Sequence, residues 1–448
     1  MSRRTVLAIV AAAALGAGAA PAPAARWSPP DRVPDSTGFG VPYDLAVNAG
    51  GRLAVAFPRG GIRVAVRRPR GGWEPTVEVS RTETAVASPQ LTLDSSGAIT
   101  VVWLQAAALR PPFGAPYTIR AATRDTRGRW SRPATLGMSN HFELAEPQLA
   151  MNERGDAVVA WRGLRKEDPS GATEAVLLAY RPAGRRRFRK AQPIQEPLVP
   201  RKVYDQRVAL DAAGRVHVVW TTSEGPAVRY AVRKRNGRLG RIRTLSSPPA
   251  SRPQLAVAGD GGVVVGWRAA DVDSEGEGLR YGPPWAIVRR PSGAWARARQ
   301  LSAVPIYTPL VAASAFGRAL VAWAPPPNPD ATEPSDPDLR FSARNRGGDL
   351  LAERKVSGVP IGAESFAPAR RLGMLQDGTA VVLAGGDAGI AASELRWGGT
   401  FGPLRTLSRV GDAPLVATAG RRLAGVFTVD GGPDEGRWLS VVIRRVTG

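Results

Sequence analysis

One sequence pattern recurs along most of the chain and constrains its fold more than any single residue does. The pattern Pro-Gln-Leu-x-Leu-Asp-x-x-Gly-x-x-x-Val-Val-Trp stands at residues 89–103 and recurs with substitutions eight times between Asp44 and Phe427. The aligned glycines are Gly51, Gly97, Gly155, Gly214, Gly261, Gly317, Gly378 and Gly420. A period near fifty residues is typical of a supersecondary unit stacked on copies of itself. Because the repeat leaves little of the 448 residues outside it, we expect one domain over residues 25–448.

Each repeat predicts four short antiparallel strands. In the second unit they are expected at residues 90–93, 98–103, 117–123 and 130–136, where apolar residues alternate or β-branched residues run together between turn signals. Four-stranded sheets that repeat at this period are typical of β-propeller blades. The fold class is therefore predicted as an all-β propeller.

The two ends of the repeat region predict a closed ring. The eighth unit ends after its third strand at residues 439–445, and residues 26–28, Arg-Trp-Ser, mirror the start of a fourth strand at residues 129–131. If the N-terminal strand completes the last blade, no sheet edge stays open. The direct count is eight blades; seven is the alternative if the weak unit around Gly378 is absorbed.

The first residues resemble an export signal. Arg3 and Arg4 precede an apolar run over residues 6–20 and small residues that end at Ala24. The run is short and alanine-rich for a membrane span, so residues 1–24 are predicted to be removed by either the general secretory or the twin-arginine route. We expect a secreted or extracytoplasmic monomer with no membrane span in the mature chain.

The formal net charge of +23 comes almost wholly from arginine, and the chain has no cysteine, which excludes disulfides and thiolate metal sites. Such a charge attracts anionic polymers, nucleic acid or lipid headgroups; the alternative is a compositional bias without function. Arginines four apart in the third strands could form a basic, polyanion-binding stripe, with nucleic acid the least favoured partner. They are Arg63, Arg67, Arg120, Arg124, Arg229 and Arg233.

A large ring stands six residues after the aligned glycine in the first six units. These rings are Phe57, Trp103, Trp161, Trp220, Trp267 and Trp323. Aromatic rings can stack on sugars, but a ring at the same place in each blade favours packing between blades.

The loops on one face of the disc vary most in length and chemistry, which makes that face the candidate binding face. At the start of each first strand, near the central mouth, polar side chains recur. The candidate ligand-binding residues are Asp44, Gln90, Gln148, Arg207, Gln254 and Arg371. The alternative is that these side chains hydrogen-bond neighbouring backbone.

Metal and cofactor signals are few. Asp271, Asp273 and Glu275 look like the opening of a calcium loop, although Gly282 stands where the last carboxylate belongs, and a solvated acidic loop is the alternative. Ca²⁺ is therefore a possible ligand and no cofactor is expected to be required. His141 and His217 are too few for a three-histidine zinc site, and His217 is expected to be packed locally.

Residues 40–446 resemble the sialidase-like propellers built from bacterial neuraminidase repeats. That family carries a Ser/Thr-x-Asp-x-Gly-x-x-Trp box between third and fourth strands; residues 123–130 approach it with one extra residue, and residues 292–295 keep a remnant. The resemblance is in architecture and implies a propeller fold. A sialidase needs three arginines, a tyrosine with a glutamate partner and an aspartate, and no local signature assigns these residues here. The carboxyl and tyrosine residues expected in binding-face loops are Glu143, Asp168, Glu174, Tyr204, Asp205, Asp271, Asp273 and Tyr281.

Three functions remain open from the sequence. The first is a secreted, non-catalytic propeller that binds a carbohydrate, a cell-envelope polymer or an extracellular protein through its loop-rich face. The second is a sialidase-like glycoside hydrolase or lyase that uses Arg207, Arg371 and a loop carboxylate. The third is the arginine-rich polyanion surface.

Overall fold

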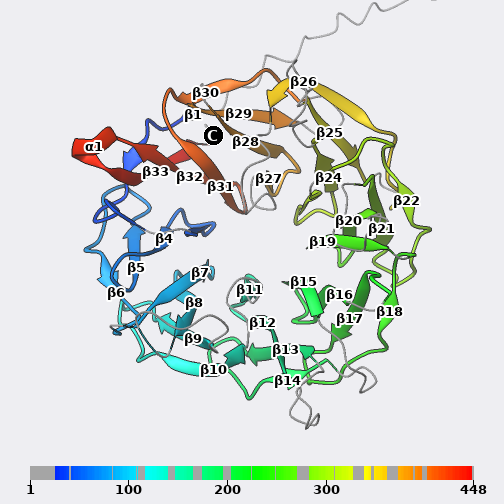
Figure 1. The fold of residues 1–448 in the computed structure, drawn as a ribbon, viewed down its shortest axis with the longest axis horizontal. Helices are drawn as coiled ribbons and strands as arrows, with labels where there is room; N and C mark the ends of the chain where they lie inside the picture. Colours follow the sequence, from blue (N-terminus) through cyan, green and yellow to red (C-terminus); the bar gives the residue numbers. More distant parts are fainter. Residues whose placement is uncertain are drawn as a thin grey trace, which may run out of the picture.

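The chain forms eight β-sheets arranged as a ring around a central opening (Figure 1). The computed structural model describes residues 26–39, 42–82, 84–106, 108, 117–139, 147–164, 174–194, 203–222, 225–247, 249–269, 282–306, 308–325, 338–344, 348–360, 372–386, 389–395 and 401–445. The predicted propeller of eight four-stranded antiparallel blades is confirmed, and the seven-bladed alternative is wrong because the unit around Gly378 forms a blade of its own.

The strands follow the repeat in order. Blade 1 comprises β3 (Asp44–Val47), β4 (Leu53–Pro58), β5 (Ile62–Arg67) and β6 (Val77–Glu78), and blade 2 comprises β7 (Val86–Leu93), β8 (Ile99–Ala106), β9 (Tyr117–Arg124) and β10 (Ala134–Ser139). Blade 3 comprises β11 (Gln148–Met151), β12 (Ala157–Leu164), β13 (Glu174–Arg181) and β14 (Gln192–Pro193). Blade 4 comprises β15 (Val203–Leu210), β16 (Val216–Thr222), β17 (Arg229–Arg233) and β18 (Arg243–Thr244).

Blades 5 to 7 comprise β19 (Ala250–Val257), β20 (Val263–Ala269), β21 (Pro284–Arg289), β22 (Arg299–Gln300); β23 (Leu310–Ala313), β24 (Ala319–Trp323), β25 (Asp338–Ala343), β26 (Arg354–Pro360); and β27 (Leu372–Met374), β28 (Ala380–Gly386), β29 (Gly389–Leu395), β30 (Arg405–Ser408). Blade 8 comprises β31 (Asp412–Ala419), β32 (Arg422–Asp430) and β33 (Arg437–Arg445), completed by β1 (Arg26–Trp27) and β2 (Asp31–Arg32). The helix α1 (Gly432–Glu435) joins β32 to β33, and no helix among the described residues has the length and apolar character needed to cross a membrane.

The N-terminal strand closes the ring as predicted. Trp27 pairs with Arg444 of β33 just as Trp130 pairs with Arg124 inside blade 2. The amide of Ser28 donates to the carbonyl of Ile443 at 2.8 Å, and the Ser28 hydroxyl accepts from the Ile443 amide at 2.9 Å. Ser131 makes the same two bonds with Thr123 at 2.8 and 3.0 Å, so the mirrored sequence reproduces the fourth-strand geometry of an ordinary blade.

The core lies between neighbouring blades, and the repeated rings fill it. Phe57, Trp103, Trp161 and Trp323 are fully buried, and Trp220 and Trp267 are nearly so. The packing interpretation of these rings is confirmed, because rings without exposed surface cannot stack on a sugar. The aligned glycine adopts a positive φ in each blade, for example +85° at Gly97, and the repeat keeps glycine there because other residues are strained in this conformation.

The predicted basic stripe is wrong for the second arginine of each pair, Arg67, Arg124 and Arg233. Arg67 pairs with Asp31 at 2.9 Å, Arg124 pairs with Glu74, and Arg233 lies over the ring of Tyr180 at 4.7 Å. Each of these arginines therefore contacts the preceding blade instead of solvent. Strand alternation predicts which residues share a face, but not that the preceding blade covers that face.

Candidate ligand-binding site

The first strands line the central opening, because each contacts the first strand of the next blade around the whole ring (Figure 1). A β-bulge interrupts this strand at its loop-face start in blades 2, 4, 5 and 8. The bulges hold non-glycine residues at positive φ, which are Ser88 at 49°, Asp205 at 54°, Arg252 at 54° and Ala413 at 49°. This conformation is costly outside glycine, and bulges re-aim side chains beside functional sites. Strained backbone thus recurs at the mouth of the central opening, in blades 2, 4, 5 and 8.

Two of the predicted mouth residues hold neighbouring blades together. The buried carboxylate of Asp44 accepts the amide of Leu91 in blade 2 at 2.7 Å. The Gln90 side chain accepts the amide of Leu149 in blade 3 at 2.8 Å. In blades 1 and 2 the aligned position is therefore an acceptor for the next first strand, in line with the backbone alternative stated for this ring.

Arg207 breaks this arrangement in blade 4. Its guanidinium donates to Gln254 Oε1 of blade 5 at 3.3 Å and to the Gln206 carbonyl at 2.9 Å. Arginine has no acceptor atom, so it cannot repeat the bond that Asp44 and Gln90 make. Gln254 is buried, and within the described chain its Nε2 has no hydrogen-bond partner. Gln148 is half-buried at the start of β11, and Arg371 lies outside the described residues.

An ion pair missed by the sequence analysis lies beside these residues. Arg162 Nε and Glu174 Oε2 are 3.5 Å apart, and their side chains are 2% and 4% exposed. Both side chains hold the start of β15: the Val203 amide donates to Glu174 at 2.9 Å, and Arg162 donates to the Val203 carbonyl at 3.0 Å. The Arg162 guanidinium also lies 5.5 Å from the centre of the Tyr204 ring.

The adjoining bulges extend this polar region to blade 5. Asp205 accepts the Arg252 amide at 3.1 Å and lies 3.7 Å from its guanidinium. We call Arg162, Glu174, Tyr204, Asp205, Arg207, Arg252 and Gln254 the mouth cluster. Five members were candidates from the sequence: Arg207 and Gln254 as ligand-binding residues, and Glu174, Tyr204 and Asp205 as loop residues. The signal for Arg162 was an arginine directly after the buried strand-end tryptophan, which recurs as Trp267-Arg268.

The aligned position that Gln90 and Arg207 share gives a prediction about stability. Changing Gln90→Ala should lower the free energy of unfolding by about 1–2 kcal/mol, because the Leu149 amide loses its acceptor. Arg207→Gln places an acceptor in the same position of blade 4 and keeps an N–H donor for Gln254, so it should cost less than about 1 kcal/mol. Urea unfolding of the two variants measures the difference; equal losses would show that the position has one role in both blades.

Three carboxyl groups with a lowered pKa, those of Asp125, Asp156 and Asp211, lie on the face of the disc opposite the candidate binding face. Burial alone would raise their pKa, but hydrogen bonds from the Ala183 amide and Asn152 lower the pKa of Asp156, and those from His217 and Arg215 lower the pKa of Asp211. The Arg129 amide lowers the pKa of Asp125. A catalytic general acid needs a raised pKa at neutral pH. These three groups are therefore suited to structural ion pairs.

His217 is packed and hydrogen-bonded as predicted. Its Nδ1 lies 2.7 Å from Tyr230 Oη and its Nε2 lies 3.4 Å from Asp211, while Arg215 also donates to Asp211. Burial lowers the pKa of His217, and Arg215 and Arg289 add to this, whereas Asp211 acts the other way. Burial also raises the pKa of Tyr230, so the histidine and the phenol are both neutral at pH 7.

This histidine makes stability depend on pH. Below the unfolded-state pKa of about 6.5 the unfolded chain binds a proton that folded His217 does not, so stability falls as pH falls. The contribution of Asp211 is lost only at much lower pH, because its unfolded pKa is near 3.9. Between pH 6.5 and 5.5, His217→Gln should reduce the slope of the unfolding free energy by up to about 1.4 kcal/mol per pH unit. An unchanged slope in urea titrations would contradict this assignment.

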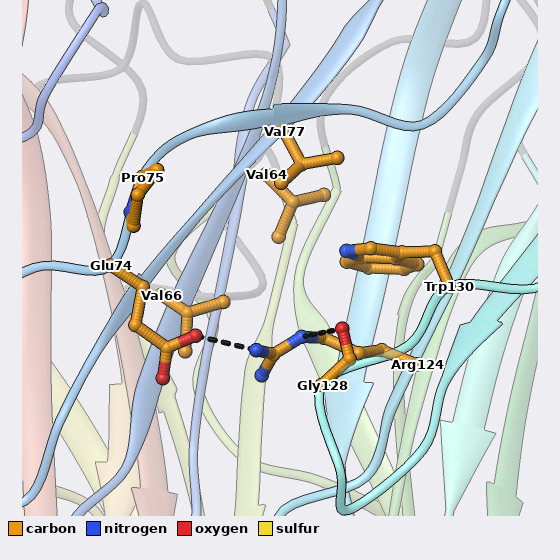
Figure 2. A pocket seen from close by; sticks show the side chains of 8 residues that line it. All are labelled: Val64, Val66, Glu74, Pro75, Val77, Arg124, Gly128 and Trp130. Atoms are coloured by element: carbon orange, nitrogen blue, oxygen red, sulfur yellow. Dashed lines mark hydrogen bonds and ion pairs between the residues drawn. The ribbon is translucent and has the colours of Figure 1, made fainter.

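A crevice of about 200 Å³ opens between blades 1 and 2 at the rim (Figure 2). Trp130, Val64, Val66 and Val77 form its apolar walls, and Arg124 bonds to Glu74 and to the Gly128 carbonyl within it. At other interfaces the residue corresponding to Val64 is an aromatic ring: Tyr230 contacts Trp295 at 4.8 Å, and Phe341 contacts Phe401 at 5.2 Å. The crevice is therefore a packing gap left by a smaller side chain.

The calcium-loop residues Asp271, Asp273 and Glu275 lie outside the described residues. Elsewhere in the described part of the chain, no three histidine or carboxylate side chains gather as a metal site.

Comparison with known proteins gives architecture only. No protein-family model and no curated protein matches the sequence. Among solved structures, polysaccharide lyase Uly1 shares 10% identity over 78% of this chain and 88% of its own, with a TM-score of 0.49. Puromycin hydrolase shares 18% over 89% of this chain and 61% of its own (TM-score 0.46), and the α-L-arabinanase of Penicillium chrysogenum shares 12% over 67% and 92% (TM-score 0.39). Likenesses this distant say nothing about activity, and the propeller assignment rests on the strand order itself.

Proposed function

We propose that the chain is a secreted, non-catalytic propeller that binds a carbohydrate, a cell-envelope polymer or an extracellular protein at the mouth cluster. The observation that carries this proposal is Arg207. Its position serves as a blade-to-blade acceptor in Asp44 and Gln90, and an arginine cannot serve that purpose. A cationic residue without an acceptor atom, at a place where neighbouring blades use an acceptor, points to a role in recognition.

The chemistry of the cluster favours a polar ligand with acidic groups. It holds three arginines and two carboxylates, and the carboxylates contact Arg162 and Arg252. Besides its bonds to Gln254 and Gln206, the Arg207 guanidinium supplies a positive charge with which a carboxylate or sulfate can pair. Gln254 Nε2 adds a buried donor for a hydroxyl or carbonyl. A carbohydrate with uronate or sulfate groups presents both.

The catalytic alternative is a glycoside hydrolase or lyase. It requires a pair of carboxyl groups with separated pKa values, one of them raised. The two carboxylates of the mouth cluster, Glu174 and Asp205, are each held by an arginine, which favours the binding function over this alternative.

One preparation of residues 25–448 tests both functions. It is screened against neutral and acidic glycans, envelope fractions and extracellular proteins, and against fluorogenic glycosides including sialosides, with and without calcium. Binding without turnover supports the proposal. Turnover, or a folded sample that binds nothing in the panel, overturns it.

A further inference from the structure

Exposed cations gather on one sector of the rim, away from the mouth cluster. Residues 125–133, 183–190 and 234–243 form the turns between third and fourth strands, and the strand edges after them, in blades 2, 3 and 4. We call these three segments the basic sector. Its thirteen exposed basic residues are Arg127, Arg129, Arg132, Arg185, Arg186, Arg187, Arg189, Lys190, Lys234, Arg235, Arg238, Arg241 and Arg243. The three segments contain one carboxylate, Asp125.

The three turns form one continuous surface. Arg186 of blade 3 reaches Asp125 of blade 2 at 4.0 Å, and Arg235 of blade 4 reaches the buried Asp156 of blade 3 at 3.8 Å. Figure 1 shows β10, β14 and β18 following one another along the outer edge of the ring. The antiparallel order of each blade places these turns on the face opposite the loop-rich mouth.

Composition alone does not explain this distribution, because a general arginine bias would load all blades alike. In blade 1 the corresponding segment carries Glu74, which contacts Arg52, Arg68 and Arg124. In blade 5, Arg290 pairs with Asp349 at 3.0 Å. Residues 68–76 of blade 1 thus hold two arginines and one glutamate, and residues 290–298 of blade 5 hold two arginines, one of them paired, whereas the segments of blades 2 to 4 carry a larger excess of exposed positive charge.

We propose that the basic sector binds a linear acidic polysaccharide, whose repeated carboxylate or sulfate groups pair with arginines of successive blades. Arginine matches such groups through two parallel hydrogen bonds. The exposed large apolar side chains of the described chain are Val77, Met138, Phe316, Leu351 and Val410, and none lies in the sector, so no apolar anchor for a lipid surface is present there. Its rings are half-buried, with Phe188 beneath the guanidinium of Arg181 at 5.4 Å, which disfavours stacking on nucleic-acid bases.

The test compares two variants that remove equal charge. One changes Arg185→Ser, Arg186→Ser and Arg187→Ser together; the control changes the exposed Arg70→Ser, Arg297→Ser and Arg421→Ser. Calorimetry with heparin and with polygalacturonate over a salt series should show that the wild type binds and that affinity falls steeply with salt. The sector variant should bind about tenfold more weakly, with a smaller salt dependence, while the control changes less than about twofold.

Four outcomes overturn the proposal. The first is equal loss in both variants, which indicates net charge alone; the second is no binding of either polysaccharide by the folded wild type. The third is tighter, sector-dependent binding of single-stranded DNA or of phosphatidylglycerol vesicles than of the polysaccharides. Loss of heparin binding in Arg207→Gln but not in the sector variant would assign that binding to the mouth cluster and would likewise overturn the proposal, so the two surfaces are tested separately.

Discussion

A chain that begins at Val33 is expected to lose about 5 kcal/mol or more of unfolding free energy relative to one that begins at Arg26. The shorter chain lacks β1 and β2, and with them the two Ser28 bonds and the pairing of Trp27 with Arg444. Each lost backbone bond costs about 1 kcal/mol and the lost tryptophan packing about 2–3 kcal/mol. Because native proteins are stable by only about 5–15 kcal/mol, this loss removes most of the stability.

The same truncation should also make the protein aggregate. It leaves the long edge of β33 unpaired, and exposed strand edges template intermolecular pairing. Thermal unfolding and size-exclusion chromatography measure both effects, with the chain from Arg26 as the control. A chain from Val33 that stays monomeric and unfolds at the control temperature would contradict the closure described here.

Breaking the buried ion pair of the mouth cluster is expected to cost about 3–5 kcal/mol in either single variant, Arg162→Met or Glu174→Leu. Each change leaves one charge in a site where the two side chains are only 2% and 4% exposed. The double variant should be far less destabilised than the sum of the two, because it leaves no unpaired buried charge. Urea unfolding of the three variants measures this coupling, and additive losses would show that the two residues act independently.

The fold could be predicted from the sequence because its signals are local and repeated. Three signals recur in register: the glycine that permits the first turn, the aromatic ring six residues later and the alternation of each strand. The weaker repeats can therefore be aligned on one well-preserved repeat. Ring closure was also predictable, because Arg26-Trp27-Ser28 copies a fourth-strand start and makes the same hydrogen bonds.

The site could be predicted only in part, because it depends on contacts between blades. Alternation places Arg124 on one face of its strand but does not reveal that Glu74 of the preceding blade covers it. Alignment brings Gln90 and Arg207 to equivalent positions, whereas their different partners follow from the register of neighbouring first strands. Arg162 and Glu174 come from different strands, and only the pairing of β12 with β13 brings them together.

The most direct test of the proposed binding function measures affinity and stability of Arg207→Gln on the same samples. The ligand is the tightest glycan or envelope component bound by the wild type, and Gln90→Ala is the matched control. We expect Arg207→Gln to keep a stability near that of the wild type and to lose about tenfold or more in affinity, while Gln90→Ala loses stability and keeps affinity. An Arg207→Gln variant that binds the ligand as tightly as the wild type would contradict the proposed binding function.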